Sequence, residues 1–212
     1  DGQFRPEAPI TRAEIAVIFT NIFGTYINES GTYTQNVDGN MVISADGVTL
    51  EGQTITGDLI IAEGVGDGHI VLDSVTVEGK LIVRGGGENS IIIKGNSKIG
   101  TVTVSRQGGE VRLSVEDSAK VDMIVINDGS EDVKVEGKVD QLTVAAADVT
   151  VTVTGNVSDI DVETTAENSR VILTNSAKVN TVTVTADNTQ IDTEKGAKVD
   201  EVITSAADTT VS

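Results

Sequence analysis

The sequence repeats itself with a period of about 20 residues, and this repeat constrains the fold more than any other feature. Short runs of alternating apolar and polar residues recur in three series. The first inward-pointing apolar residues of these runs are Leu59, Leu81, Val102, Ile124, Leu142, Ile160, Val182 and Val202 in the first series, Ile70, Ile91, Val111, Val133, Val151, Val171 and Ile191 in the second, and Val77, Ile99, Val121, Val139, Val157, Val179 and Val199 in the third. Three series that advance together predict three short strands per turn of a solenoid.

The predicted fold is therefore all-β: a single-stranded parallel β-helix of about eight coils, right-handed by the usual preference of parallel crossovers. Alternation within a run, as in Thr101–Val104, places apolar side chains in a narrow interior and polar ones toward water. An antiparallel sandwich would explain neither the three series nor their regular step. Because Val48 precedes Ile70 by one further step, we expect the β-helix to occupy residues 41–212.

The first 35 residues differ in composition from the rest, since they hold all five aromatic residues and both prolines. Here the sequence predicts an amphipathic α-helix over Arg12–Phe23. Thr11 and Glu14 have the spacing of a capping box, and one stripe of the helix is apolar: Ile15, Ile18, Phe19 and Ile22. An open solenoid end exposes its core and its strand edges, so we expect this helix to cap the N-terminal end. Residues 25–40 are expected to be a connecting segment.

Residues 2–24 begin Gly-Gln-Phe-Arg-Pro-Glu-Ala-Pro-Ile-Thr-Arg-Ala-Glu-Ile-Ala and end Phe23-Gly24. This stretch resembles the second half of an S-layer homology (SLH) motif, whose hallmark is G-x-F-x-P followed by I-T-R-A-E. The positions that match are Phe4, Pro6, Thr11, Arg12 and Glu14. The first half of the motif is missing, and one half-motif is not expected to bind cell-wall polymer alone.

The resemblance implies an exported bacterial protein at the extracellular cell surface. In that family, tandem SLH motifs anchor proteins non-covalently to cell-wall polysaccharide. Residues 1–24 are then the remnant of an upstream anchor, and cell-wall polysaccharide is a partner through that upstream region. The chain would be part of a longer surface protein.

Charge and composition exclude several functions. The chain has 15 Lys and Arg against 33 Asp and Glu, a net charge of −18, and a pI near 4.2. Phosphate backbones and anionic membrane surfaces repel such a protein, so neither nucleic-acid binding nor docking on such a membrane is expected. No apolar run approaches the ~20 residues of a spanning helix, so membrane insertion is not expected either. There is no cysteine and only one histidine, His69. Thiolate catalysis, a catalytic zinc site and a serine triad are therefore not expected.

The clearest charged pattern flanks the third series. Lysines come directly before its inward residues, at Lys98, Lys120, Lys138, Lys178 and Lys198, and Asn156 interrupts the row. Aspartates follow the same inward residues at Asp122, Asp140 and Asp200. Stacking predicts a lysine row beside an aspartate row. One interpretation is a linear site for acidic polysaccharide; the favoured one is a solvated face with ion-pair ladders.

A second polar cluster lies on adjacent coils of the second series and comprises Glu110, Arg112, Asp132, Lys134 and Glu136. It resembles the sites of polysaccharide lyases, in which carboxylates hold calcium and a basic residue abstracts a proton. Here the acids and bases pair off as neighbours, which favours a cross-strand salt network. Arg112 and Lys134 remain candidate glycan contacts beside the lysine row.

One acidic loop offers oxygen ligands for calcium through Asn127, Asp128, Glu131 and Asp132. It matches no known ligand spacing, and we expect no other cofactor.

Four early outward positions are apolar, namely Ile60, Val71, Ile82 and Ile92. An apolar outer face predicts a cover, which residues 25–40 or a partner subunit would supply.

The favoured function is a non-catalytic structural or assembly module of a bacterial cell-surface, S-layer-associated protein that associates end to end through its end coils. The alternative is a binding module for acidic cell-wall or plant polysaccharide. A polysaccharide lyase is the third and least favoured hypothesis.

Overall fold

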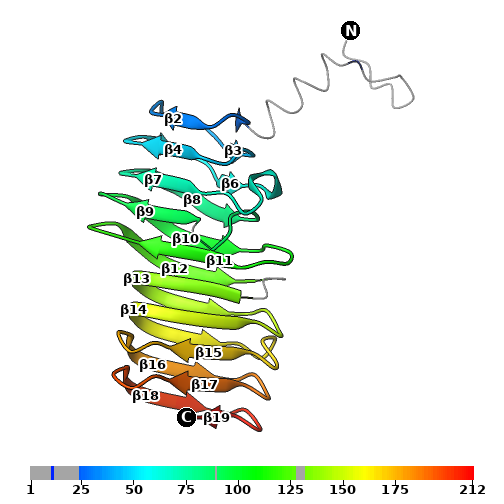
Figure 1. Cartoon of the computed structure of the whole chain (residues 1–212), viewed down its shortest axis with the longest axis vertical. Helices are drawn as coiled ribbons and strands as arrows, with labels where there is room; N and C mark the ends of the chain where they lie inside the picture. Colours follow the sequence, from blue (N-terminus) through cyan, green and yellow to red (C-terminus); the bar gives the residue numbers. More distant parts are fainter. Residues whose placement is uncertain (1–10, 12–23, 89, 128–131) are drawn as a thin grey trace.

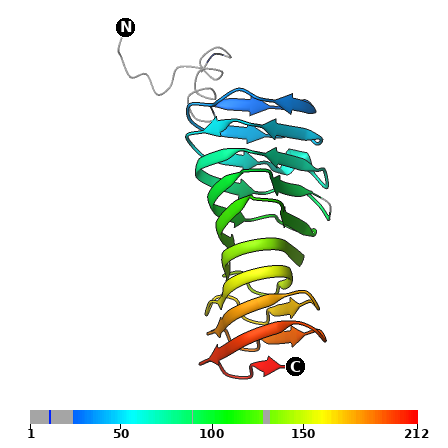
Figure 2. The same cartoon turned by 90° about the vertical axis from the view of Figure 1, so that its left-hand side faces the viewer.

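The computed structural model describes residues 11, 24–88, 90–127 and 132–212, and it shows an all-β parallel solenoid of about nine turns (Figure 1). Strands stack along the long axis of the molecule, and every strand pairing between described residues is parallel (Figure 2). The parallel β-helix predicted from the repeat is confirmed. None of the helices in the described part of the chain is long and apolar enough to cross a membrane.

The three predicted series correspond to three faces of the solenoid. Face A contains β1 (Thr25–Ile27), β3 (Met41–Ile43), β6 (Leu59–Ile61) and the C-terminal parts of β8 (Thr76–Val83), β10 (Lys98–Val104), β12 (Lys120–Ile126), β13 (Asp132–Val144), β14 (Thr150–Val162), β16 (Lys178–Val184) and β18 (Lys198–Thr204). Face B contains β2 (Gly31–Tyr33), β4 (Val48–Glu51), β7 (Ile70–Asp73), β9 (Ile91–Lys94), β11 (Val111–Val115), the N-terminal parts of β13 and β14, β15 (Arg170–Leu173), β17 (Gln190–Thr193) and β19 (Thr210–Val211). Face C contains β5 (Thr54–Ile55), the N-terminal parts of β8, β10, β12, β16 and β18, and the middle parts of β13 and β14. A short 3-10 helix, η1 (Glu63–Val65), lies in one corner between faces A and B.

The register within the ladders agrees with the predicted steps on faces A and C. On face B one step is wrong: Ile91 lies beside Leu113, whereas the sequence placed it beside Val111. Val111 and Leu113 are both fully buried. A slip of two residues keeps the same side chains pointing inward, so the alternation alone does not distinguish the two registers.

The connecting segment expected over residues 25–40 is also wrong, because it contains the first coil. β1 pairs with β3, β2 pairs with β4, and Val37 forms a bridge with Ile55. Strands of three residues are too short to show a clear alternation, which explains why the pattern did not reveal them. The helix and cap expected over residues 12–23 lie outside the described residues.

The core is a set of stacked aliphatic side chains inside the solenoid. Leu59, Leu81, Val102, Ile124 and Leu142 follow one another on face A, and all five are fully buried. Burying each such side chain contributes about 1.5–3 kcal/mol. The parallel register places like residues above one another, at the ~4.8 Å spacing of paired strands.

Coil length changes in the middle of the rod. β12 is preceded by a corner in which Asp117 has a positive φ of 56°, whereas β13 and β14 run through the equivalent corner as continuous strands. Gly137, with φ 96°, makes this possible. A Cβ atom at Gly137 would lie 1.8 Å from the carbonyl oxygen of Val115. The shorter coil therefore requires glycine at this position.

We expect Gly137→Ala to lower the free energy of unfolding by at least about 2 kcal/mol, because it combines a strained φ with a clash against the neighbouring coil. Urea unfolding followed by circular dichroism measures the effect. Gly100→Ala is the matched control, since no atom lies within 4 Å of its added Cβ. It should change the stability by less than about 0.5 kcal/mol. Equal stability of the two variants would contradict the close packing at Gly137.

Candidate binding faces and the ion-pair network

The lysine row predicted from the sequence lies on face C. Lys98 is in register with Lys120, Lys178 is in register with Lys198, and Asn156 lies between Lys138 and Lys178. All five lysines of the row are exposed. Parallel pairing places them above one another, because each directly precedes an inward valine or isoleucine.

An aspartate row runs beside the lysine row, as expected. Asp122, Asp140 and Asp200 are exposed and stand two residues after the lysine of the same strand, a separation of about 6.6 Å along an extended chain. Where the coil length changes, the face is hollowed. This hollow has a volume of about 250 Å³ and is lined by Ala119, Lys120, Val121, Asp122, Lys138 and Asp140.

The expected ion-pair ladder does not form along this row. Among the described residues, the ion pairs join other basic side chains to carboxylates, and none of them involves a lysine of the row. The register places lysine beside lysine between coils, and an aspartate of the adjoining coil stands in the diagonal position that carries the ion pairs on face B, as Asp122 does for Lys98. On face C no ion pair among the described residues uses these diagonals. Face C thus presents two separate stripes of opposite charge.

The polar cluster on face B forms the cross-strand salt network that the sequence favoured. Arg112 and Lys134 are neighbours in register, and each reaches diagonally to a carboxylate of the adjoining coil. Arg112 Nη2 lies 2.5 Å from Glu136 Oε2, and Lys134 Nζ lies 2.5 Å from Glu110 Oε1. The contact with Glu136 raises the pKa of the Arg112 guanidinium, and the contact with Glu110 raises the pKa of Lys134. Asp132, the fifth member of the cluster, is exposed at the start of β13.

The candidate calcium loop is only partly described. Asn127 and Asp132 are exposed, whereas Asp128 and Glu131 lie outside the described residues. In the described ranges, no group of three or more His, Asp or Glu side chains is arranged to hold a metal ion.

The apolar outer face predicted in the early coils is divided. Ile60 and Ile82 are neighbours on face A, whereas Val71 and Ile92 are neighbours on face B. All four are half-buried. They therefore form two separate pairs, and the segment expected to cover them forms the first coil.

The corner between faces A and B contains a set of contacts made by Arg106, here called the Arg106 clamp, that the sequence did not predict. The Arg106 guanidinium donates to the carbonyl oxygens of Gly86 and Glu110 and forms an ion pair of 2.5 Å with Asp67. One side chain thus joins corner loops of three successive coils. Residues that lie 39 positions apart carry no local signal for such a contact.

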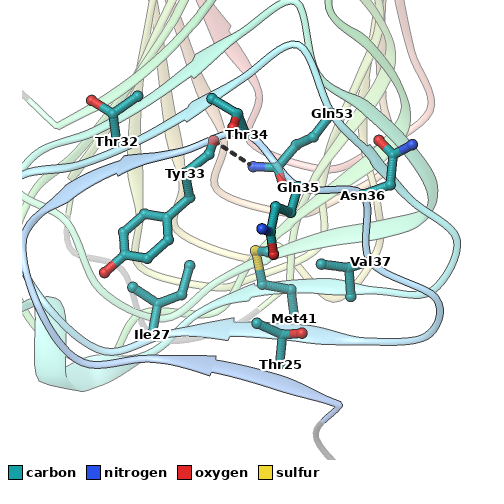
Figure 3. Close-up of a pocket in the computed structure, with 10 residues that line it drawn as sticks. All are labelled: Thr25, Ile27, Thr32, Tyr33, Thr34, Gln35, Asn36, Val37, Met41 and Gln53. Carbon is teal, nitrogen blue, oxygen red and sulfur yellow. Dashed lines mark hydrogen bonds between the residues drawn. The ribbon is translucent and has the colours of Figure 1, made fainter.

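A second hollow, of about 360 Å³, opens at the N-terminal end of the core (Figure 3). Its lining includes Ile27, Met41 and Gln53. The amide nitrogen of the buried Gln53 side chain donates to the carbonyl oxygen of Tyr33 over 3.1 Å. The first coil is thus tied to the second by a buried side chain as well as by its strands.

No protein-family model, no curated protein and no solved structure matches the chain. Of the residues that resemble an SLH motif, Thr11 is described and exposed. Phe4, Pro6, Arg12 and Glu14 lie outside the described residues.

We expect the Lys134 ammonium to titrate above the ordinary lysine pKa of about 10.4, because Glu110 stabilises its charged form. Glu110→Gln should return the pKa of Lys134 toward that value. A raised folded-state pKa adds stability below the unfolded-state pKa, and this stability is lost as pH rises through the folded-state pKa. The stability difference between wild type and Glu110→Gln should therefore be full at neutral pH and shrink above a pH of about 10.4.

Nuclear magnetic resonance titration of Lys134 and urea unfolding at several pH values measure the two effects. Glu116→Gln is the control, because Glu116 accepts a hydrogen bond from Ser114 and its charge helps to raise the pKa of Arg112. A Lys134 that titrates identically in wild type and Glu110→Gln would contradict the assignment.

Proposed function

We propose that the chain is a non-catalytic structural or assembly module of an extracellular bacterial surface protein of the S-layer-associated type. The observation that carries the proposal is the way in which ion pairs connect the coils. Each ion pair between described residues joins different coils, as Arg112–Glu136, Lys134–Glu110 and Arg170–Asp192 do. These side chains fasten the coils to one another, which supports a mechanical role for the rod.

The acids and bases that resemble a lyase site support the same proposal. Glu110, Arg112, Lys134 and Glu136 are engaged with one another across two coils. Such contacts hold adjacent coils in register. The surface location is supported by the resemblance of residues 2–24 to half of an SLH motif.

End-to-end association is supported by the end coils. The exposed large apolar side chains of the described residues are Tyr26 in the first coil and Ile203 and Val211 in the last, at 58%, 47% and 51% exposure. Ile203 and Tyr26 occupy the same outward position on face A, at opposite ends of one column. A second copy stacked in register would place these two side chains together, and the ladders would continue across the junction.

We expect the purified chain to form rods that lengthen with concentration, seen by sedimentation velocity and electron microscopy. Ile203→Lys should shift the rods toward single units, because it places a charge within the apolar junction. Thr183→Lys is the matched control, since Thr183 holds the same outward position one coil earlier. Compact monomers at every concentration, or equal loss of rods in both variants, would contradict end-to-end stacking.

A second candidate function is the binding of acidic polysaccharide, favoured by the five exposed lysines that form no ion pair among the described residues. We expect the double variant Lys120→Glu/Lys138→Glu to bind polygalacturonate at least about tenfold more weakly than wild type, as the contacts are electrostatic. Isothermal titration calorimetry at low ionic strength measures the affinity. Unchanged binding would remove this candidate.

A further inference from the structure

The two charged stripes of face C are complementary to each other. The lysine stripe consists of Lys98, Lys120, Lys138, Lys178 and Lys198, and the aspartate stripe of Asp122, Asp140 and Asp200. Both stripes run along the rod, and the side chains of both are exposed. Asn156 interrupts the lysine stripe, and Ser158 and Asn180 separate Asp140 from Asp200. Within each stripe like charges stack, so each stripe is a row of one sign.

A two-fold axis parallel to the rod brings unlike stripes together. When a second copy is turned by 180° about such an axis and laid against face C, left and right are exchanged while the level of each coil is kept. Lys120 of one copy then faces Asp122 of the other, and the reverse contact forms at the same level. The same reciprocal pairing occurs at Lys138 with Asp140 and at Lys198 with Asp200.

The remaining levels place no like charges opposite each other. Lys98 would face Gly100 and Lys178 would face Asn180, and Asn156 would face Ser158. The gap in the lysine row therefore coincides with a neutral residue in the aspartate row. A two-fold axis across the rod would instead set lysine against lysine, so the stripes select the parallel arrangement.

We propose that face C is a lateral interface at which two copies of this chain associate side by side and parallel, held by reciprocal lysine–aspartate contacts. This lateral association is a second mode of assembly beyond end-to-end stacking. It does not depend on that stacking, because lateral association uses face C and end-to-end stacking uses the end coils. The lateral interface would give these lysines carboxylate partners in a second copy, whereas the basic residues of face B have theirs in the adjoining coil.

A second copy fits this face better than an acidic polymer does. The aspartate stripe lies about 6.6 Å from the lysine stripe and would repel a polyanion that reaches the lysines. The net charge of −18 opposes both partners at long range. A second copy, however, supplies lysines for the aspartates as well as aspartates for the lysines.

Ionic strength should have a biphasic effect on association. At very low salt the net charges of two copies repel each other over long distances. At 0.1–0.15 M the Debye length is about 8–10 Å, so this repulsion is screened while the close contacts persist. At 1 M salt the contacts are screened as well. We therefore expect the dimer fraction to be highest at intermediate salt.

The test reverses each stripe separately, in an Ile203→Lys background, in which we expect end-to-end stacking to be weakened. One variant carries Lys120→Asp, Lys138→Asp and Lys198→Asp; the other carries Asp122→Lys, Asp140→Lys and Asp200→Lys. Sedimentation equilibrium at 0.15 M salt should show dimerisation at least about tenfold weaker in each variant alone, because each would set like charges against each other. A mixture of the two variants should associate at least as tightly as wild type.

A third variant that carries all six changes exchanges the stripes and should dimerise like wild type. Lys195→Asp is the control for a charge change away from the stripes, and circular dichroism shows whether each variant is folded. The proposal is overturned if the two single-stripe variants dimerise as wild type does, or if their mixture does not associate. It is also overturned if the aspartate-stripe variant keeps its dimerisation and gains affinity for polygalacturonate, which would assign the lysine row to a polyanion.

Discussion

The parallel, in-register pairing of strands between coils is the interaction on which the rest of the molecule depends. It satisfies the backbone hydrogen bonds of each coil with those of its neighbours, and it places each residue directly above its counterpart. Inward positions then form continuous aliphatic stacks, as on face A from Leu59 to Val182. The same geometry stacks the outward residues, so that any charge that recurs in the sequence becomes a row of like charges about 4.8 Å apart.

The repulsion within such rows of like charge is relieved differently on faces B and C. On face B the stacked basic residues Arg112 and Lys134 each reach a carboxylate diagonally on the adjoining coil. On face C the lysine and aspartate rows lie side by side in the same way, but no ion pair among the described residues joins them. Like charges there are relieved by exposure to water and by the neutral Asn156, while the opposite row remains available for contacts outside the chain. Face B therefore holds the rod together, and face C is the better candidate for contact with a partner.

The sequence predicted those features that follow from local alternation. Inward residues, the three faces and the lysine row were all predictable, because a two-residue period and a recurring step determine them. The pairing of Ile91 with Leu113 was not, since a slip of two residues leaves the inward set unchanged. The Arg106 clamp depends on how corner loops stack. By contrast, the corner residues Asp148, Asn168, Asn188 and Asp208, all with positive φ, recur at a regular step that the sequence does show.

The change of coil length links the fold to the candidate interface. Gly137 removes a corner by passing close to Val115, and the next residue is Lys138 of the lysine row. The longer coil before it keeps its corner around Asp117, and Ala119 at the end of that corner lines the hollow beside Lys120 and Lys138. A glycine needed for backbone packing thus also shapes the surface at two of the lysines.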